Sequence, residues 1–386
     1  MHIAFDISQT GSGKAGCGYY AHALIQSILE LTPRENSYSL LPSFGSFYFD
    51  SSMPLLNPYS GKNVKYGPRH LSLGSVRKFW TEPNIETLLG KPDVIHANNF
   101  WCPTQLSSSR LVYTLYDLGF LENPNWTTET NRVGCFEGVF RASIKADWIV
   151  SISEFTRDHF LNFFSWFPSD RIRVIYPCSR FTDSNSEGVR PPKSERLFPE
   201  KFWLSVGTIE PRKGYDTLVD AYARYLSLGG DILPLVIAGG KGWLMDDFQK
   251  RIENLGIANH VIMLGYVSDE NLIWLYRHCF ANLYPSLFEG FGLPILEGMQ
   301  FGAPTLASNS SSIPEVVGDS AIMISPGNTE IWAQTMVRLI KDKSLRTRLS
   351  EASRVRVQSF SWKNSAFSLL SLYDEAVLSP KRTSSL

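Results

Sequence analysis

The sequence predicts an α/β protein built from two Rossmann-like domains, and three observations support this fold class. Short apolar runs alternate with stretches of helical periodicity, which indicates parallel strands with helices on both faces of each sheet. The chain has 386 residues, of which 43% are apolar, and this is enough for two separate cores. The strand signals form two series separated by a polar stretch without periodicity, residues 179–200, which we predict to be a linker.

The first series of strand signals defines a predicted domain of residues 1–178. We expect strands near residues 2–7, 37–42, 93–97, 111–116, 147–152 and 173–176, and helices near 19–31 and 84–90. A glycine-rich segment, residues 11–18, follows the first strand and opens the first helix, where it could hold a phosphate. A dinucleotide-binding fingerprint would also need an acidic residue about 20 residues further on. Ser39, Leu40 and Leu41 stand there instead, which speaks against an NAD-dependent oxidoreductase.

The second series defines a predicted domain of residues 201–360. We expect strands near 202–206, 234–238, 261–264, 280–284 and 304–307, with helices near 215–227, 246–255, 270–277, 330–341 and 344–358. The alternation again indicates a parallel sheet covered by helices on both faces.

Two carboxylates, Glu289 and Glu297, flank a Gly-Phe-Gly turn and a proline in this second domain. Glycine lets the backbone turn tightly and approach a ligand closely. Pro294 suits the first helical position, and the free N–H groups of that helix would face the turn at Gly292 and Leu293 as an anion site. Glu297 would then lie in the first helical turn. The alternative is an ordinary helix start, in which acidic residues complement the helix dipole.

Arg212 and Lys213 lie in a strand-to-helix loop that is flanked by glycines. This is the carboxyl end of a presumed parallel strand, where open α/β sheets bind ligands. The planar donor fork of arginine and the compact charge of lysine both suit a diphosphate. A basic pair in a loop is more often plain surface, but here its position favours a site. Together the two motifs indicate a sugar-nucleotide site, with cations for the phosphates and carboxylates for the hydroxyls.

These motifs, their order and their separation resemble the retaining glycosyltransferases of family four, which have the GT-B fold. Segments 149–156, 235–243 and 313–318 agree with that family, and the resemblance is strongest from about residue 200 to 340. It implies two Rossmann-like domains facing each other across a central cleft, with the acceptor on the first and the nucleotide-sugar donor on the second. It also implies that the C-terminal helix, about residues 361–386, packs back on the first domain.

The resemblance assigns roles in the donor site. Arg212, Lys213 and the helix N-terminus would stabilise the leaving diphosphate, which is electrostatic catalysis. Glu289 would orient the sugar hydroxyls and Glu297 would bind the ribose diol. The further donor-binding positions are the loop residues Phe291, Gly292 and Leu293, the backbone at Tyr266 and Val267 for the base, and the amides of Gly16 and Gly18 for the distal phosphate.

In the first domain this chain departs from the family pattern. Relatives commonly have a histidine where Tyr116 stands and an arginine where Tyr19 stands. Asp117 is therefore the catalytic candidate of this domain, although an aspartate at a strand end is more often a cap or turn residue. Tyr116 and His96 are candidates for acceptor contact, and a structural role in the core is the alternative for His96. In the family's reaction a phosphate oxygen can take the proton of the acceptor hydroxyl.

The predicted reaction is retaining transfer of a hexose from a nucleotide-sugar to a glycan or lipid-linked saccharide in polysaccharide biosynthesis. Family precedent divides between UDP-sugars and GDP-mannose. We take UDP-glucose as the donor on frequency, and a GDP-mannose-dependent mannosyltransferase as the alternative. A non-hydrolysing sugar-nucleotide epimerase and a catalytically silent sugar-nucleotide binder stay open.

The composition limits the partners of the chain. It has 37 basic and 37 acidic residues, which does not suggest a nucleic-acid partner. Five cysteines without metal-ligand spacing and the lack of an Asp-x-Asp motif predict reduced thiols, no cofactor and activity without a divalent metal. A strand signal from the second residue and no apolar run near the roughly 20 residues of a membrane span predict a cytoplasmic protein. Residues 69–80 and 155–167, rich in aromatics, could contact the membrane surface or be a loop and a core helix.

Overall fold

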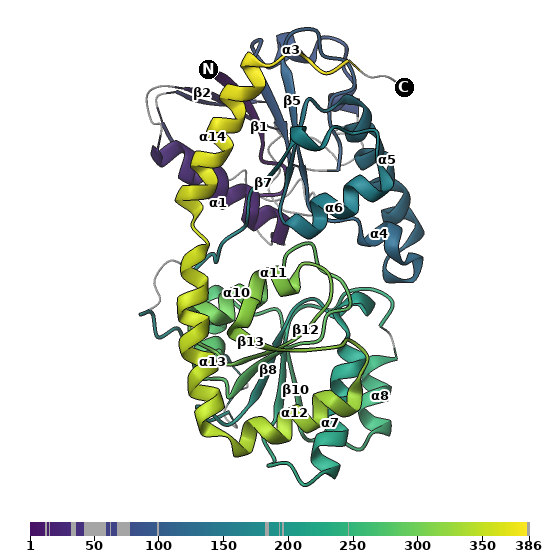
Figure 1. Cartoon of the computed structure of the whole chain (residues 1–386), viewed down its shortest axis with the longest axis vertical. Coiled ribbons are helices and arrows are strands. Elements are labelled where there is room, and N and C mark those ends of the chain that lie inside the picture. The colour runs from purple at the N-terminus through teal and green to yellow at the C-terminus, as the bar shows by residue number, and fades with distance from the viewer. Residues whose placement is uncertain are drawn as a thin grey trace. The chain divides into compact units, whose positions relative to one another are not determined.

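The protein divides into two compact units (Figure 1). Unit 1 comprises Met1–Leu121, Glu129–Cys178 and Phe360–Leu386, and unit 2 comprises Glu122–Thr128 and Ser179–Ser359. The computed structural model describes residues 1–11, 14, 16–31, 36–41, 59–61, 63–67, 78–98, 100–181, 185–192, 194, 197–245 and 247–383.

Unit 1 is built on a seven-stranded parallel sheet with the order β3-β2-β1-β4-β5-β6-β7. Its strands are β1 (His2–Asp6), β2 (Ser37–Leu41), β3 (Val64–Tyr66), β4 (Val94–Ala97), β5 (Arg110–Leu115), β6 (Trp148–Ser151) and β7 (Ile172–Val174). The helices are α1 (Gly16–Leu31), α3 (Ile85–Leu88), α4 (Gly119–Glu122), α5 (Glu129–Lys145), α6 (Glu154–Phe163), α14 (Trp362–Leu378) and the short 3-10 turn η2 (Ser169–Arg171). The strand order reverses between β1 and β4, so a ligand-binding crevice is expected beyond the carboxyl ends of these strands.

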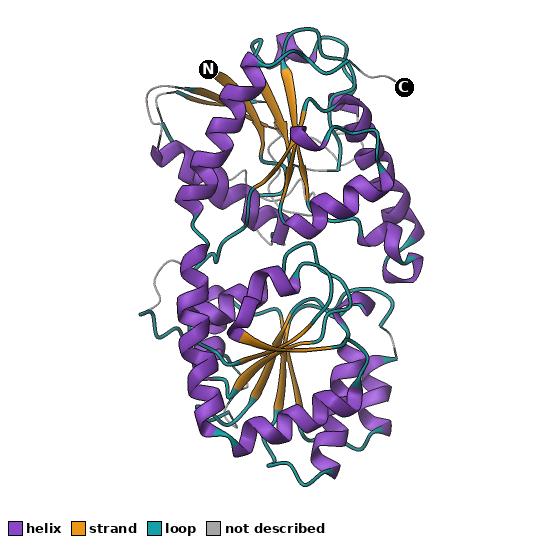
Figure 2. Ribbon diagram, in the orientation of Figure 1, coloured by secondary structure: helices purple, strands orange, loops and turns teal. Residues whose placement is uncertain are grey.

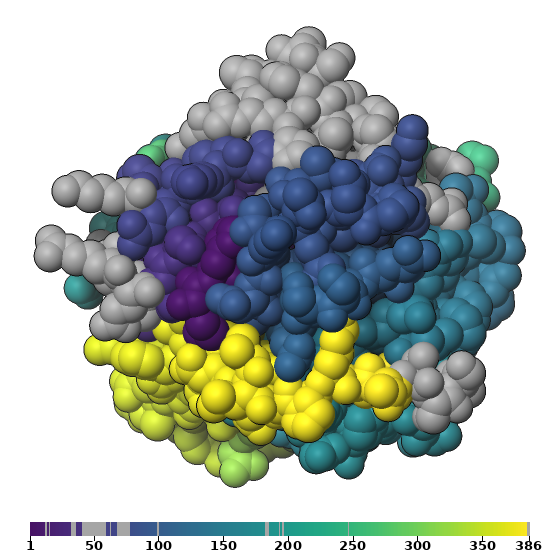
Figure 3. Space-filling model, turned by 90° about the horizontal axis from the view of Figure 1, so that it is seen from above, coloured from purple at the N-terminus to yellow at the C-terminus, as the bar shows by residue number. Residues whose placement is uncertain are grey.

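The C-terminal part of the chain completes unit 1. Helix α14 packs along α1, and the space-filling view shows these last residues, in yellow, beside the N-terminal ones, in purple (Figure 3). The backbone N–H of Arg382 donates to Oδ1 of Asp147 at 2.7 Å, and the Arg110 guanidinium donates to the carbonyl of Ala376 at 3.0 Å. Helix α14 therefore packs within unit 1.

Unit 2 is built on a six-stranded parallel sheet with the order β10-β9-β8-β11-β12-β13. Its strands are β8 (Trp203–Val206), β9 (Leu235–Ala238), β10 (Val261–Gly265), β11 (Ala281–Tyr284), β12 (Thr305–Ser308) and β13 (Ala321–Ile324). Its helices and turns are η1 (Pro124–Trp126), η3 (Pro211–Lys213), α7 (Tyr215–Ser227), α8 (Phe248–Asn254), α9 (Asp269–His278), α10 (Leu293–Gln300), α11 (Ile313–Val317), η4 (Gly318–Ser320), α12 (Thr329–Lys341), α13 (Lys343–Arg356) and η5 (Val357–Ser359).

The centre of each sheet is buried on both faces because helices cover both sides (Figure 2). In unit 2, β8, β9, β11 and β12 are entirely buried, which is why they appear in the sequence as short apolar runs. The order reverses between β8 and β11, so the loops that follow these two strands meet at the switch point of the sheet.

The predicted fold class is confirmed: both halves are parallel α/β sheets of the Rossmann-like kind. The predicted domain boundaries, with a linker at residues 179–200, remain a prediction. One difference is clear, since residues 122–128 fall inside the predicted first domain but pack with unit 2. The reason is Trp126, whose carbonyl accepts a hydrogen bond from the Trp243 indole at 2.8 Å and whose ring lies against Phe288.

Candidate functional site

Three loops at the carboxyl edge of the unit 2 sheet are hydrogen-bonded to one another. The loop after β8 pairs with the loop after β9: the Ile209 N–H donates to the Gly240 carbonyl at 3.0 Å, and the Gly242 N–H donates to the Ile209 carbonyl at 3.1 Å. A Cβ on Gly239 would lie 1.9 Å from the Gly207 carbonyl oxygen, so only glycine allows this approach. The loop after β11 joins through the Leu287 N–H, which donates to the Arg212 carbonyl at 2.7 Å. The backbone of η3, with its two cations, is thus held in place.

Glu289 is the centre of a polar cluster formed by these loops. Lys213 Nζ donates to Oε1 at 2.6 Å and Arg212 Nη1 donates to Oε2 at 3.1 Å. The hydroxyls of Tyr284 and Ser286 each donate to Oε1 at 2.6 Å. The structure therefore brings together three residues that sequence analysis placed in two separate motifs.

The charge of Glu289 follows from these contacts. Burial alone would raise the pKa of the carboxyl, but the charges of Lys213 and Arg212 and the hydrogen bonds of Lys213 and Ser286 lower the pKa to about 2. Glu289 is therefore ionised at neutral pH and can only accept hydrogen bonds. A fixed acceptor of this kind suits hydroxyl groups, such as those of a sugar.

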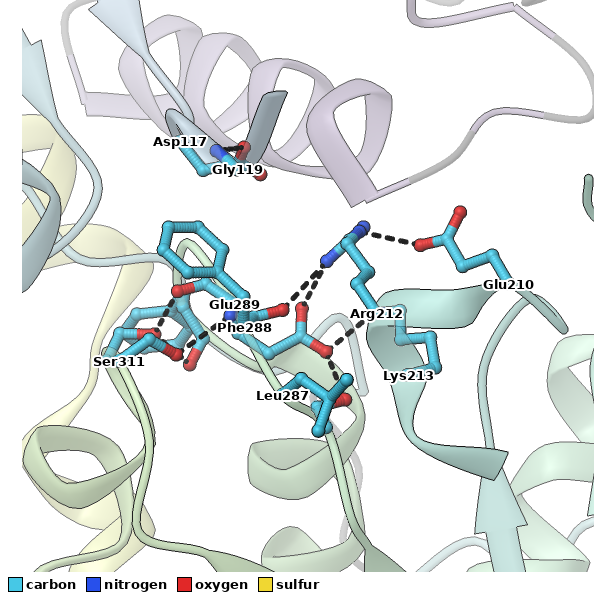
Figure 4. Close-up of polar contacts among 12 residues, drawn as sticks. Asp117, Gly119, Glu210, Arg212, Lys213, Leu287, Phe288, Glu289 and Ser311 are labelled. Carbon is cyan, nitrogen blue, oxygen red and sulfur yellow. Dashed lines mark hydrogen bonds and ion pairs between the residues drawn. The ribbon is translucent and has the colours of Figure 1, made fainter. Parts of the chain in front are cut away.

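Arg212 lies between two carboxylates, Glu289 and Glu210 (Figure 4). Its Nε is 2.7 Å from Oε1 of Glu210, a residue that the sequence analysis did not single out. The side chains of Arg212 and Lys213 are 24% and 12% exposed, so both cations are partly desolvated. Arginine carries five N–H donors and lysine three, so these residues can bind a carboxylate and a phosphate at once.

The turn after Glu289 is tied down by serines. The Glu289 N–H donates to Ser311 Oγ at 2.8 Å, and Ser312 Oγ donates to the carbonyls of Glu289 and Phe291 at 2.9 and 3.0 Å. Ser311 has a φ of 51° and Gly292 a φ of 107°, and such left-handed backbone costs energy for a serine but little for a glycine. Phe291 is buried, so only its backbone could meet a ligand.

Glu297 lies in α10, and its position in that helix differs from the prediction. The helix begins at Leu293, with Pro294 second, so Glu297 lies beyond the first turn. Its side chain is 5% exposed and is paired with Arg180, whose Nε is 3.0 Å from Oε1. The Tyr276 hydroxyl donates to Oε2 at 3.2 Å. Burial raises the pKa of Glu297, and Arg180 and Tyr276 offset this only in part.

The predicted base-contacting segment lies beside the bonded loops. The Gly239 N–H donates to the Gly265 carbonyl at 2.9 Å, which ties the residues after β10 to the loop after β9. Tyr266 follows with 71% of its surface exposed, while Val267 packs on the apolar core below. The backbone here is at the same sheet edge as Arg212, as the donor-site prediction requires.

In unit 1, the first turn of α1 packs closely against the segment that follows β1. A Cβ on Gly18 would lie 2.1 Å from the Gln9 carbonyl oxygen, so the residue must be glycine for packing alone. Gly16 is exposed at the start of the helix. The Tyr116 hydroxyl donates to the Cys17 carbonyl at 3.3 Å, and burial raises the pKa of Tyr116, so it stays a neutral hydroxyl.

Asp117 makes the contact expected of a turn residue. Its Oδ1 accepts a hydrogen bond from the Gly119 N–H at 2.9 Å, at the start of α4 (Figure 4). The side chain is only partly buried. The cap and the catalytic role are compatible, because a carboxylate has a second oxygen, so the catalytic role stays a proposal.

The acceptor contact predicted for His96 does not agree with the structure. The ring is completely buried in β4, and its Nε2 is 2.8 Å from Thr114 Oγ1 while Nδ1 is bonded to the Tyr373 hydroxyl. Burial lowers the pKa of His96 to about 3, so the ring is neutral. The structural alternative fits: His96 joins the sheet to α14.

The aromatic segment 155–167 is divided between core and surface. Phe160, Phe164 and Phe167 belong to the core of unit 1, whereas Phe163 and Trp166 are exposed. Most of the other candidate membrane segment, residues 69–77, lies outside the described residues. In the described part of the chain, no helix is long and apolar enough to span a bilayer, and no group of three or more potential ligands forms a metal site.

Comparison with known proteins identifies the class. Residues 191–356 match the family described as "Glycosyl transferases group 1". The "O-antigen chain mannosyltransferase B" of Escherichia coli is 30% identical over 287 residues, which cover 73% of this chain and 74% of the relative. The "Serotype-specific mannosyltransferase WbdA" of Escherichia coli is 29% identical over 405 residues, covering 95% of this chain but 47% of the relative, so this chain spans about half of that protein.

Two solved structures share the fold. HepE of Anabaena in complex with UDP-glucose has a TM-score of 0.68 at 20% identity and covers 97% of this chain and 100% of its own. Sucrose-phosphate synthase of Thermosynechococcus elongatus has a TM-score of 0.73 at 18% identity, covering 97% of this chain and 98% of its own.

Together these findings define a GT-B glycosyltransferase. The chain belongs to the glycosyl transferases group 1 family. The predicted enzyme class, a retaining hexosyltransferase, is thereby confirmed, and the epimerase and oxidoreductase alternatives lose their support.

Proposed function

We propose that this enzyme transfers mannose from GDP-mannose to a saccharide acceptor in polysaccharide biosynthesis. The names of the two Escherichia coli relatives support mannose as the sugar, and they favour our alternative over UDP-glucose, which we chose only on frequency. The acceptor would be a growing glycan or a lipid-linked saccharide at the inner face of the membrane.

One observation carries the catalytic assignment: the Arg212–Lys213 pair contacts Glu289 at the switch point of the unit 2 sheet. The phosphate oxygens of a nucleoside diphosphate bound there would accept hydrogen bonds from Arg212 and Lys213. As the bond from the sugar C1 to the phosphate oxygen breaks, negative charge grows on the diphosphate, and Arg212 and Lys213 would stabilise it. The acceptor hydroxyl forms the new bond to C1 on the same face, and its proton passes to a phosphate oxygen.

The other assignments follow the same proposal. Glu289 would accept hydrogen bonds from the sugar hydroxyls, and Glu297 would bind the ribose diol. Backbone at Tyr266 and Val267 would meet the base. From unit 1, the amides of Gly16 and Gly18 would bind the distal phosphate, and Asp117 would act near the acceptor hydroxyl together with Tyr116.

Calorimetric titration of the purified protein with GDP, UDP and ADP tests the donor, followed by turnover of GDP-mannose with mannoside acceptors in EDTA. We expect micromolar binding of GDP alone and turnover without a divalent ion. Selective binding of UDP would overturn the assignment of GDP-mannose as the donor. If no nucleotide bound, the assignment of the donor site itself would be overturned. In the same assay Asp117→Asn separates the roles of that residue, since a cap tolerates asparagine whereas a catalytic carboxylate does not.

A further inference from the structure

Arg180 contacts Glu297 with one edge of its guanidinium group and Asp269 with another nitrogen. Nε lies 3.0 Å from Oε1 and Nη2 lies 3.5 Å from Oε2, while Nη1 lies 3.3 Å from Oδ1 of Asp269 at the start of α9. Arg180 itself comes from neither helix. It is the second residue of the segment with which the chain enters unit 2 after β7.

Arg180 holds the Glu297 carboxylate by one long hydrogen bond, from Nη2 to Oε2, and by the ion pair of Nε with Oε1, in which Nε does not form a hydrogen bond. These two contacts restrict the orientation of the carboxylate. A guanidinium is a rigid planar fork, so two contacts define the orientation of a carboxylate in a way that a single point charge cannot. The Tyr276 hydroxyl, from α9, adds a third contact on Oε2. A carboxylate has about four lone-pair sites, so acceptor capacity remains on Oε1 for a ligand hydroxyl.

Arg180 also acts on the charge of Glu297. In the described part of the chain, the titratable groups that act on this carboxyl are Arg180, which lowers its pKa, Tyr276, which lowers it by a hydrogen bond, and Asp269, which raises it. A protonated carboxyl accepts hydrogen bonds from hydroxyls more weakly than a carboxylate does. Without Arg180, the buried group would keep its proton to higher pH.

We propose that Arg180 is a positioning residue that aims Glu297 at the ribose hydroxyls of the donor nucleotide. The proposal rests on the ribose-binding role of Glu297 in the proposed function. The alternative is a purely structural role, in which Arg180 only anchors the segment that begins at Ser179 to α9 and α10. The two differ in one respect: a structural tie would affect all nucleotides equally, whereas a positioning residue affects the discrimination between ribose and deoxyribose.

The test compares GDP with 2′,3′-dideoxy-GDP by calorimetry, and the readout is the ratio of the two dissociation constants. We expect wild-type protein to favour GDP by about tenfold or more, the scale of hydrogen bonds to a charged group. In Arg180→Met the ratio should fall close to one. Arg180→Lys keeps the charge but loses the fork, so its ratio should be intermediate.

Arg277→Met is the matched control. Arg277 pairs with Glu187 at 2.8 Å, so this variant also breaks an ion pair between α9 and the segment that follows Arg180, without touching Glu297. Its ratio should equal that of the wild type. A pH series adds a second readout: the ratio should fall as Glu297 is protonated, and in Arg180→Met, which removes the charge, the midpoint should move to higher pH.

The outcomes distinguish the ribose-binding role of Glu297 from the positioning role of Arg180. A wild-type ratio near one would overturn the ribose role of Glu297 and the positioning role with it. A large wild-type ratio that persists in Arg180→Met would overturn the positioning role alone. If Arg180→Met does not fold, Arg180→Lys decides: a ratio equal to that of the wild type would overturn the proposal. If the wild type binds UDP instead of GDP, the same ratio is measured with UDP and its dideoxy analogue.

Discussion

Glu289 and Glu297 are the same residue type, lie in one motif and are both buried, yet their surroundings move the pKa in opposite directions. At Glu289, two cations and the Ser286 hydroxyl outweigh burial and lower the pKa to about 2. At Glu297, one arginine and one tyrosine do not outweigh burial, and the pKa stays raised. Burial depth alone therefore does not decide the charge of a carboxylate; the number of cationic partners does.

The difference suits two tasks. Glu289 is held by Arg212 and Lys213, the same cations that would bind the departing diphosphate. It must therefore stay charged while these cations form contacts with the phosphates. A carboxylate that would only recognise ribose needs orientation more than charge density. Changing the partners of one carboxylate at a time should therefore separate turnover from nucleotide affinity.

The largest effect is expected from Lys213→Ala. This change removes a cation that would stabilise the leaving diphosphate and a direct partner of Glu289, 2.6 Å away. We expect turnover to fall by about 10² to 10³-fold, or about 3–4 kcal/mol of transition-state stabilisation. Steady-state kinetics with GDP-mannose would measure it. Lys250→Ala, at an exposed pair with Asp247, is the control and should keep wild-type turnover. Wild-type turnover in Lys213→Ala would refute the diphosphate assignment.

The next effect is the acid dependence of stability. Because the folded pKa of Glu289 lies below its ordinary value of 4.5, its stabilising effect is full above that pH and is lost as pH falls toward about 2. Between pH 4.5 and pH 2, the loss of unfolding free energy should be smaller in Glu289→Gln than in the wild type, by on the order of a few kcal/mol. The contribution of Glu297 to the free energy of unfolding depends on pH in the opposite direction. Its pKa is raised in the folded protein, so protonation favours the folded state.

Urea unfolding at pH values from 7 to 3 would compare the two carboxylates. Glu297→Gln lacks the gain on protonation, so its stability should fall more steeply with acid than that of the wild type. The comparison fails if both glutamine variants change the acid slope in the same direction.

A smaller effect is expected from Tyr276→Phe, which removes one hydrogen bond from Glu297. The dissociation constant for GDP should rise by a few-fold, about 0.5–1.5 kcal/mol, and the pKa of Glu297 should rise further. Tyr284→Phe removes the corresponding bond from Glu289, where Lys213, Arg212 and Ser286 remain. Its effect on GDP affinity should be smaller, and a larger one would contradict the proposed division of roles.

The sequence predicted most of the fold because buried parallel strands are short apolar runs. Each strand expected from the sequence has a counterpart in the structure. Strands β3 and β13 were missed, since both lie at sheet edges and are only partly buried. Helix α5 was missed because Val133, Phe136 and Phe140 are exposed, so its apolar residues do not form one stripe.

The candidate site was predictable where its chemistry is local in sequence. Arg212, Lys213, Glu289 and Glu297 stand in motifs with glycines and prolines, and such motifs can be recognised without a structure. Their partners cannot. Arg180 lies in a segment without periodicity, more than a hundred residues before Glu297, and Tyr276 looks like any buried aromatic of a helix. Only the fold brings these residues together, and the partner that gives His96 its structural role, Tyr373, is likewise remote in sequence.

The return of α14 to unit 1 has a consequence for biosynthesis. Unit 1 includes Phe360–Leu386, which a ribosome makes only after it has completed the whole of unit 2. About 180 residues separate the two main parts of unit 1, which is roughly 10 to 40 s of translation. During that time His96 in β4 lacks its hydrogen-bond partner Tyr373, and α1 lacks the packing of α14. The second unit to appear in the sequence is thus the first that the nascent chain can finish.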